Sequence, residues 1–176
     1  MDANRSSAAC IYIRLARIDD LPAIVAIYNQ AVESKHSTAD TEPLQVEDRK
    51  AWFREHPPAT HPVFVAELDG QTAGWSSLSA YRAGRAALRY TAEISYYVEE
   101  THQRRGIATA LVRHAIAACP DLRIKNLFAI VLEHNASSIR ILEKAGFEKW
   151  GFLPRVADFE GEECGHYYFG MRIPEE

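Results

Sequence analysis

Residues 103–110 read QRRGIATA and mark a turn from a strand into a helix. The strand-like run ALRYTAEISYYVEE precedes them, and apolar residues at helical spacing follow at Ile107, Leu111 and Ala115. The first backbone N–H groups of a helix lack an intrahelical acceptor and lie at the positive end of the helix dipole, so they suit an anion. The stretch therefore predicts a phosphate-binding turn, while a solvated surface turn is the alternative that a short motif leaves open.

The N-terminal half predicts a strand, two helices and a hairpin. Residues 11–17, IYIRLAR, alternate apolar and polar side chains as a strand does. Asp19 or Asp20 can cap the next helix, whose apolar stripe consists of Leu21, Ile24, Val25, Tyr28 and Val32. A second, short helix is expected over VEDRKAWFREH. Asp69-Gly70, between HPVFVAEL and QTAGWSSLSAY, is a strong signal for the turn of a β-hairpin.

The C-terminal half predicts a further alternation of strands and helices. A long strand is expected from about Leu88 to Val98, and LFAIVL is typical of a strand buried on both faces. Asn135 can cap the helix ASSIRILEKA, which Gly146 can end in a left-handed conformation. WGFLPRV and HYYFGMRI predict two more strands joined by a turn at EGEE. We therefore expect a single α/β domain with a mixed central sheet flanked by helices.

Length and composition limit the class of protein. The chain has 176 residues, 47% of them hydrophobic, which suits one domain with one sizeable core. A formal net charge of -4 gives no reason to expect nucleic acid or an anionic membrane as a partner. No stretch resembles a signal peptide or a membrane span, and the three cysteines lack disulfide or zinc spacing, so we expect a cytoplasmic protein with reduced thiols. We expect a flexible tail over residues 1–10 and the domain over residues 11–176.

Three ordered motifs resemble the GCN5-related N-acetyltransferase (GNAT) superfamily. QRRGIA after a strand is similar to that family's acyl-CoA pyrophosphate loop, and NASSIRILEKAGF is similar to its second CoA-contacting segment. ALRYTAEISYYV and GFEKWGFLPRV resemble the branch of phosphinothricin, methionine sulfoximine and other amino-acid N-acetyltransferases. The resemblance spans residues 11–173. It implies the GNAT-type fold, acetyl-CoA as acetyl donor, direct transfer in a ternary complex to the amino group of a small amino-acid-like substrate, no metal, and a homodimer.

The resemblance also implies which residues bind CoA. Asn135 would bond the pantetheine arm and Lys144 would lie near the phosphates, although Asn135 and Ser138 are equally well explained as a helix cap and its turn. The expected cofactor-binding residues are Tyr96, Tyr97, Val98, Arg104, Arg105, Gly106, Ile107, Ala108, Thr109, Asn135, Ser138 and Lys144.

Glu93 is the expected catalytic base. The amino-acid branch carries a glutamate in the strand motif TVE, and this chain has TAE at residues 91–93. An α-ammonium group must lose a proton before its nitrogen can attack a thioester, and a carboxylate can accept that proton directly or through a water molecule. A backbone N–H left free near Val98 could then stabilise the oxyanion. The alternative is a strand glutamate paired with Arg89 or Arg82.

Leu142 departs from the family's pattern. Many members carry a tyrosine at this position, and the phosphinothricin branch a histidine, as a proposed proton donor to the leaving thiolate. A thiol with a pKa of about 8.5 can leave as a thiolate. Tyr96 or Tyr97 could also take the donor's place, although such tyrosines are more often packing aromatics.

The acceptor side is expected to include Trp75, Arg82, Arg89 and Tyr90. A guanidinium group can bind a substrate carboxylate through two hydrogen bonds, whereas solvated loop arginines are the alternative. Cys164 and His166 are two residues apart and can share a strand face without forming a nucleophilic pair. Two other functions stay open: acetylation of a protein N-terminus or a polyamine, and a non-catalytic acyl-CoA-binding module, which the departure at Leu142 would suit.

Overall fold

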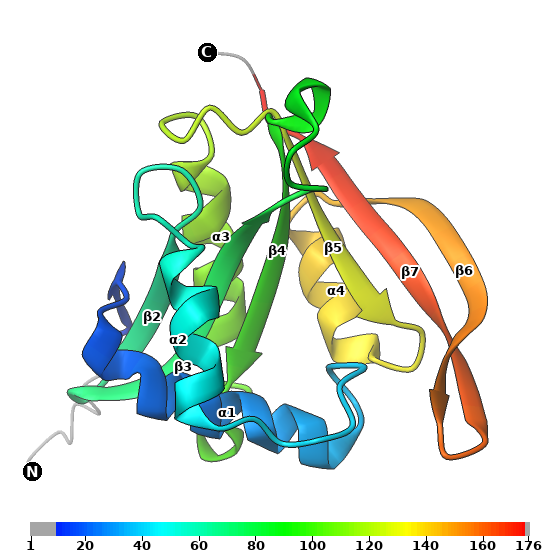
Figure 1. Cartoon of the computed structure of the whole chain (residues 1–176), viewed down its shortest axis with the longest axis horizontal. Helices are drawn as coiled ribbons and strands as arrows, with labels where there is room; N and C mark the ends of the chain where they lie inside the picture. The colour runs from blue at the N-terminus through cyan, green and yellow to red at the C-terminus, as the bar shows by residue number, and fades with distance from the viewer. Residues whose placement is uncertain (1–9, 175–176) are drawn as a thin grey trace, which may run out of the picture.

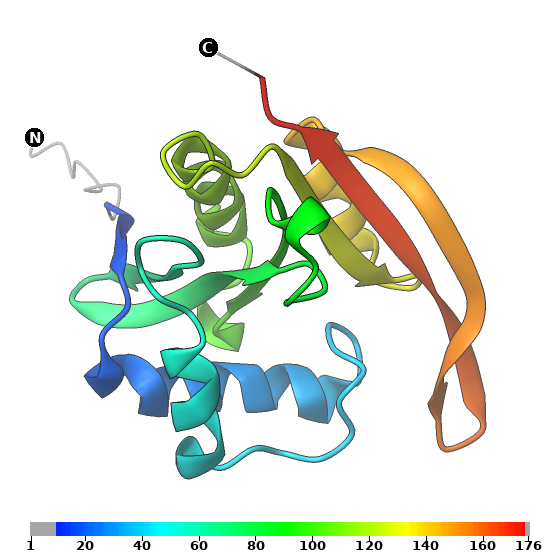
Figure 2. The same ribbon diagram turned by 45° about the horizontal axis from the view of Figure 1, so that its top comes forward.

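A seven-stranded sheet separates two pairs of helices (Figures 1 and 2). The computed structural model describes residues 10–174, so the expected tail lies outside the described residues except for Cys10. The strand order is β1-β2-β3-β4-β5-β7-β6, and β4 and β5 form the parallel pair in an otherwise antiparallel sheet. This confirms the prediction of a single α/β domain with a mixed central sheet flanked by helices.

The elements follow the predicted order along the chain. The strands are β1 (Tyr12–Leu15), β2 (Val63–Leu68), β3 (Gln71–Ala80), β4 (Thr91–Val98), β5 (Asn126–Leu132), β6 (Glu148–Phe159) and β7 (Glu162–Arg172). The helices are α1 (Leu21–Ser34), α2 (Val46–Arg54), α3 (Ile107–Ala118) and α4 (Ala136–Lys144). Within residues 10–174, no helix combines the length and the apolar character needed to span a membrane.

Each face of the sheet has its own core. Helices α3 and α4 cover one face, where Leu78, Ile94 and Leu111 belong to the larger buried cluster (Figure 2). Helices α1 and α2 cover the other face, where Ile24 and Trp75 belong to a second cluster. The apolar stripe predicted for α1 is buried as expected.

Several local predictions hold because short-range chemistry decides them. Asp69 and Gly70 both have positive φ, 52° and 79°, as the two-residue turn of a twisted hairpin requires. Asn135 caps α4, since its Oδ1 accepts the Ser138 N–H at 3.1 Å. Gly146 follows α4 with a φ of 94°, the left-handed conformation that a helix end favours.

Two local predictions are wrong: that an aspartate side chain caps α1, and that the long strand starts at about Leu88. Asp20 precedes α1 without capping it, because its carboxylate takes two hydrogen bonds of 2.8 Å from the Arg14 guanidinium and one of 2.6 Å from the Arg17 N–H. The long strand does not start at Leu88. Residues Ala86–Leu88 form a 3-10 turn, which the Arg89 side chain closes by donating to the Ala86 carbonyl at 2.7 Å, and β4 begins at Thr91.

The parallel pairing of β4 with β5 is short. It spans residues 91–93 of β4, opposite residues 126–128 of β5, while β4 stays paired with β3 as far as Val98. Beyond Glu93 the two strands diverge, and Figure 1 shows the wedge that opens between them toward α4 and the start of α3. Beyond Glu93, β4 therefore has no strand paired with it on the side of β5.

Close packing of α3 against the sheet requires a glycine at position 74. A Cβ at Gly74 would lie 2.9 Å from the Tyr97 carbonyl oxygen and 3.0 Å from Ile107 Cγ2. We expect Gly74→Ala to lower the free energy of unfolding by about 1–3 kcal/mol, the usual cost of overpacking. Chemical denaturation measures it. Gly151→Ala is the matched control, because a Cβ at Gly151 meets no atom within 4 Å; equal stability of the two variants would contradict this account of α3 packing.

Candidate functional site

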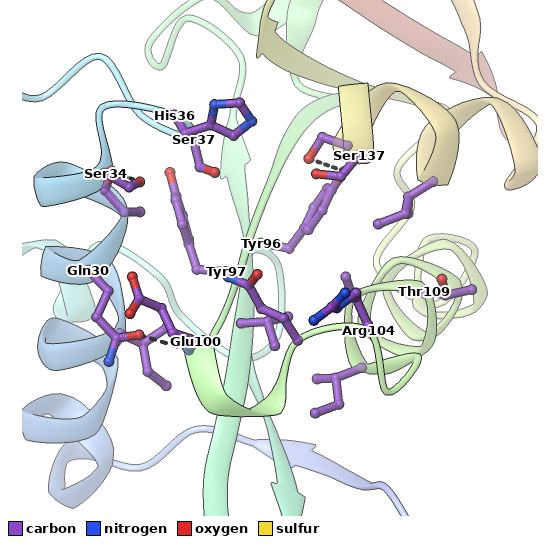
Figure 3. Close-up of a pocket in the computed structure, with 18 of the residues that line it drawn as sticks. Gln30, Ser34, His36, Ser37, Tyr96, Tyr97, Glu100, Arg104, Thr109 and Ser137 are labelled. Carbon is purple, nitrogen blue, oxygen red and sulfur yellow. Dashed lines mark hydrogen bonds between the residues drawn. The ribbon is translucent and has the colours of Figure 1, made fainter. Parts of the chain in front are cut away.

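The wedge between β4 and β5 opens into a cavity of about 760 Å³, within the range of small-ligand sites (Figure 3). Helix α1 and the loop after it form one wall, the starts of α3 and α4 form the other, and the end of β4 forms the floor. The lining residues are Ile27, Gln30, Ala31, Ser34, His36, Ser37, Tyr96, Tyr97, Val98, Glu100, Gln103, Arg104, Gly106, Ile107, Ala108, Thr109, Ser137, Ser138 and Ile141.

The start of α3 turns its backbone donors toward this cavity. Arg104 and Gly106 have φ of 61° and 84°, so the chain turns sharply before the helix begins at Ile107. The Ala110 N–H is the first that bonds within the helix, to the Gly106 carbonyl at 3.0 Å, which leaves the three preceding N–H groups without an intrahelical acceptor. A Cβ at Gly106 would meet nothing within 4 Å, so the space beside the turn is open to a ligand.

The end of β4 offers backbone groups to the same cavity. The Thr91 carbonyl and the Glu99 N–H both face β3. Antiparallel strands direct alternate residues toward each neighbour, so the N–H and C=O groups of Tyr96 and Val98 face the wedge, where β5 no longer pairs with them. A chain with alternating donors and acceptors, such as a pantetheine arm, can pair with these groups as a missing strand would.

Tyr96 and Tyr97 lie side by side on the floor and point to opposite walls (Figure 3). The Tyr96 hydroxyl donates to Ser138 Oγ at 3.0 Å, and burial raises the pKa of Tyr96 to about 12. Tyr97 packs edge-on against Tyr28 on the α1 side, with ring centroids 5.0 Å apart, and burial raises its pKa as well. Both phenols are therefore protonated at neutral pH.

Hydrogen bonds fix the two walls of the cavity. The Gln30 amide oxygen accepts the Glu100 N–H at 3.0 Å, which joins α1 to the turn before α3. Asn135 Nδ2 donates to Ser37 Oγ at 3.3 Å, which joins the start of α4 to the loop after α1. Asn135 is 4% exposed and lies behind the wall rather than in it. Its structural role as a helix cap is thus observed directly.

Glu93 precedes Tyr97 by an even number of residues in β4, so it faces the same side of the sheet, toward α1 and α2. Its carboxylate is half-buried and, among residues 10–174, forms no hydrogen bond or ion pair, so the alternative of pairing with Arg82 or Arg89 does not hold. Burial raises the pKa of Glu93 above its ordinary value. A carboxylate in this state is a stronger base than a solvated one.

The structure brings together nine of the residues expected at the cofactor and leaves the others outside the cavity wall. Arg105 and Lys144 are exposed and do not line the cavity. Arg82, Arg89 and Tyr90 lie before the start of β4, where the Arg89 guanidinium stacks 4.3 Å from the Tyr90 ring centroid. Trp75 is 1% exposed and packs beneath Tyr97 in the core, and its indole N–H has no partner within the described chain.

Sequence reasoning missed the wall formed by α1. Gln30 and Ser34 lie four residues apart on its polar face and line the cavity, as do His36 and Ser37 in the following loop. An i, i+4 pair of uncharged polar residues beside an apolar stripe was the available signal, but it is common on surface helices.

Leu142 and Cys164 are core residues. Leu142 is 0% exposed in the larger cluster and does not line the cavity. Cys164 is 7% exposed and packs with Leu132, Ala157 and Phe159, where burial and the nearby Glu133 charge raise the pKa of its thiol. Neither observation favours a nucleophilic pair of Cys164 with His166.

Comparison with known proteins identifies the family. The model of the Acetyltransferase (GNAT) family matches residues 23–147. A Bacillus subtilis protein named "Putative phosphinothricin acetyltransferase YwnH" is 40% identical over 162 residues, which cover 92% of this chain and 98% of that protein. The L-methionine sulfoximine/L-methionine sulfone acetyltransferase of Pseudomonas aeruginosa is 31% identical, with 88% of each chain covered.

Solved structures agree with these relatives. The structure of yncA from Salmonella typhimurium, solved with its cofactor acetyl-CoA, superimposes with a TM-score of 0.89 at 27% identity and covers 96% of each chain. The family model spans more than half of the chain and includes most of α1, the turn at Gly106 and the capped start of α4 that together enclose the cavity. The chain therefore belongs to the Acetyltransferase (GNAT) family, whose members use acetyl-CoA as the acetyl donor.

Proposed function

We propose that this acetyltransferase transfers the acetyl group of acetyl-CoA to the amino group of a small amino-acid-like substrate of the phosphinothricin or methionine sulfoximine type. The observation that carries the proposal is a single strand, β4, whose end forms the floor of the cofactor cavity and whose earlier residue Glu93 offers a carboxylate without a hydrogen-bond or ion-pair partner in the described part of the chain. Relatives named for phosphinothricin and methionine sulfoximine support the choice of substrate class.

In this proposal the cavity binds the cofactor along its length. The N–H groups at the start of α3 and the Arg104 side chain hold the pyrophosphate, since charge-assisted bonds and the helix dipole both favour an anion there. The pantetheine arm pairs with the free backbone groups of Tyr96 and Val98. Glu100 also lines the cavity, on the α1 side, and lies away from Arg104 in Figure 3. The thioester is then directed along β4 toward Glu93.

Glu93 acts as the general base. An α-ammonium group has a pKa of about 8 or above, so the substrate enters mostly protonated at neutral pH. Glu93 accepts that proton directly or through one water molecule, and the freed amine attacks the thioester carbonyl. Whichever wedge-facing N–H of Val98 or Tyr96 the pantetheine arm does not use stabilises the negative oxygen of the tetrahedral intermediate. The attacking nitrogen still carries one extra proton, which passes to water as the intermediate collapses by breaking the C–S bond, and the products are the neutral amide and the CoA thiolate.

The leaving thiolate does not depend on position 142. A thiol with a pKa of about 8.5 leaves readily as the anion. Burial raises the pKa of the Tyr96 phenol to about 12, above that of the thiol, so in this proposal the phenol keeps its proton and the sulfur leaves as the anion. A catalytic enzyme is therefore compatible with a buried leucine at position 142, and the alternative of a non-catalytic binding module loses its main support.

We also propose that the protein works in the cytoplasm as a homodimer. The two buried cysteines, Cys119 and Cys164, are unpaired, as is usual in a reducing compartment. Strand β6 lies at one edge of the sheet and exposes Trp150, Phe152, Leu153 and Val156, each at least 40% exposed. An edge strand with exposed apolar side chains is suited to contact a second copy of the chain.

We expect Trp150→Glu together with Val156→Glu to convert a dimer into a monomer, because two charges would then face each other across the contact. Light scattering during size-exclusion chromatography measures the mass. Tyr12→Glu, at the opposite edge of the sheet and 61% exposed, is the control that should leave the mass unchanged. A monomeric wild-type protein would contradict the dimer.

Acetyl-CoA affinity tests the turn before α3. Gly106→Asp would place a negative carboxylate beside the helix N-terminus, where the pyrophosphate is expected, so calorimetry should show at least about tenfold weaker binding, the cost of roughly one lost charged hydrogen bond. Gly70→Asp is the matched control, because Gly70 has a similar φ of 79° and equal free space but lies in the β2–β3 turn. Equal loss of affinity in both variants would trace the effect to backbone strain.

Turnover with a panel of acceptors tests the function itself. Release of the CoA thiol should be fastest with phosphinothricin, methionine sulfoximine or a related amino acid, and slower with polyamines or N-terminal peptides. Glu93→Gln, which is nearly isosteric, should slow this release at least about tenfold at neutral pH and regain part of the rate as the pH rises and free amine accumulates. Its acetyl-CoA affinity should stay unchanged. Wild-type rates in this variant between about pH 6 and 9, which brackets the α-amino pKa, would exclude Glu93 as the base.

A further inference from the structure

A buried histidine lies on the same side of the sheet as Glu93 and outside the cofactor cavity. His56 follows α2, is 7% exposed and makes two hydrogen bonds through its ring nitrogens. Nδ1 is 2.7 Å from the carbonyl oxygen of Trp52, and Nε2 is 2.9 Å from Ser79 Oγ. A carbonyl oxygen only accepts, so Nδ1 carries the ring proton. In the neutral ring Nε2 is then the acceptor, and the Ser79 hydroxyl donates to it.

Ser79 is the cross-strand neighbour of the proposed base. It lies directly opposite Glu93 in the antiparallel register of β3 and β4, so the two side chains project from the same face with their Cβ atoms about 5 Å apart. The Glu93 carboxylate is therefore the other acceptor that this hydroxyl could reach by rotating about its Cα–Cβ bond. A hydroxyl has a single hydrogen to donate, and the Ser79 hydroxyl donates it to His56.

From this arrangement we propose that His56 is a positioning residue for the acetyl transfer: it holds the Ser79 hydroxyl away from Glu93 and so keeps the carboxylate free of a protein donor. The inference rests on the proposed role of Glu93 as the base. It explains why, within residues 10–174, a half-buried glutamate next to a serine forms no hydrogen bond.

The chemical benefit follows from how hydrogen bonds act on a carboxylate. A donor to the ionised form stabilises the charge and makes the group a weaker base. Without that donor, burial alone acts on Glu93 and raises its pKa toward the range in which a general base works best. The pair of His56 and Ser79 thus protects the basicity of Glu93 without touching the substrate or the cofactor.

The surroundings of His56 favour the neutral ring that this geometry requires. Burial is the main cause that lowers the pKa of His56, and the nearby Arg49 charge lowers it further. The Trp52 carbonyl and the Glu55 carboxylate act in the opposite direction and are the weaker influences. His61 also lies close enough to sense His56, and its own pKa is lowered by burial. Acid that protonates His56 turns Nε2 into a donor and frees the Ser79 hydroxyl for Glu93.

A double-variant experiment tests this arrangement. His56→Phe keeps a ring against Trp52, whose centroid is 4.4 Å from that of His56, but removes the acceptor for the Ser79 hydroxyl. The hydroxyl should then donate to Glu93. We expect the acidic limb of the kcat/KM profile to move down by about one pH unit, the size of shift that a hydrogen bond to a carboxylate produces, and the plateau rate to fall several-fold.

Removing the Ser79 hydroxyl should reverse the effect of His56→Phe. In the variant with both His56→Phe and Ser79→Ala no donor remains, so the acidic limb should return to the wild-type position and most of the plateau rate should return with it. The Ser79→Ala single variant is the reference for this comparison. His56→Gln is a second route, because its amide can still accept from Ser79, so its acidic limb should lie at higher pH than that of His56→Phe.

If His56→Phe lowered the rate only by damaging the fold, the outcome would differ. Such damage would lower the rate of His56→Phe without moving the limb, and Ser79→Ala would not rescue it; either result would overturn the proposal. Thermal unfolding and acetyl-CoA affinity of each variant separate loss of folding from loss of positioning, since none of these residues lines the cavity. The role of Glu93 is judged separately: a fast Glu93→Gln variant rejects the base, whereas a slow one with no rescue rejects only the positioning pair.

Discussion

Strands β4 and β5 pair for three residues and then separate, and both the cavity and its free backbone groups depend on this separation. Every backbone N–H and C=O that leaves the ladder needs another partner, because an unpaired buried polar group costs about 1–3 kcal/mol. The fold leaves Tyr96 and Val98 without strand partners on one side and surrounds them with α1, α3 and α4. A ligand with its own amide groups removes this penalty when it binds. The same gap admits the N-terminus of α3, so backbone donors for a chain and for an anion lie in one cavity.

The two-residue period of β4 assigns two tasks to one strand. Successive side chains point to opposite faces, so Ala92 and Ile94 enter the core beneath α3 and α4 while Glu93 and Tyr97 face α1 and α2. Backbone groups follow a related alternation, with odd-numbered residues bonded to β3 and even-numbered ones turned to the wedge. The proposed base and the backbone donors are thereby held on one rigid element rather than on separate loops. A shift of the register by one residue would exchange all of these roles.

Local chemistry made much of this predictable from the sequence. The Asp69-Gly70 turn, the Asn135 cap and the apolar run of β5 each depend on residues within a few positions, and each was found where the sequence placed it. The start of β4 was misplaced because LRY alternates like a strand, whereas the contact of the Arg89 side chain with Ala86 curls it into a turn. The Asp20 side chain does not cap α1 because its carboxylate accepts hydrogen bonds from Arg14. Of the site, the turn at Gly106 and the end of β4 were foreseen, but the wall formed by α1 depends on packing across the sheet, which no local pattern encodes.

Burial acts on two acidic groups of the site with opposite chemical consequences. It raises the pKa of Glu93, which makes this carboxylate a better acceptor of the substrate's proton, and it raises the pKa of Tyr96, which makes this phenol a weaker acid that stays protonated. One low-polarity environment thus favours proton uptake near the start of β4 and opposes proton release near its end. In the proposed mechanism Leu142 is tolerated because the CoA thiol, with a pKa of about 8.5, is a stronger acid than Tyr96 and leaves as the anion, so position 142 is free to pack in the core. Both groups depend on the exclusion of water: a change that let water reach them would lower both pKa values, which would weaken Glu93 as a base and strengthen Tyr96 as an acid.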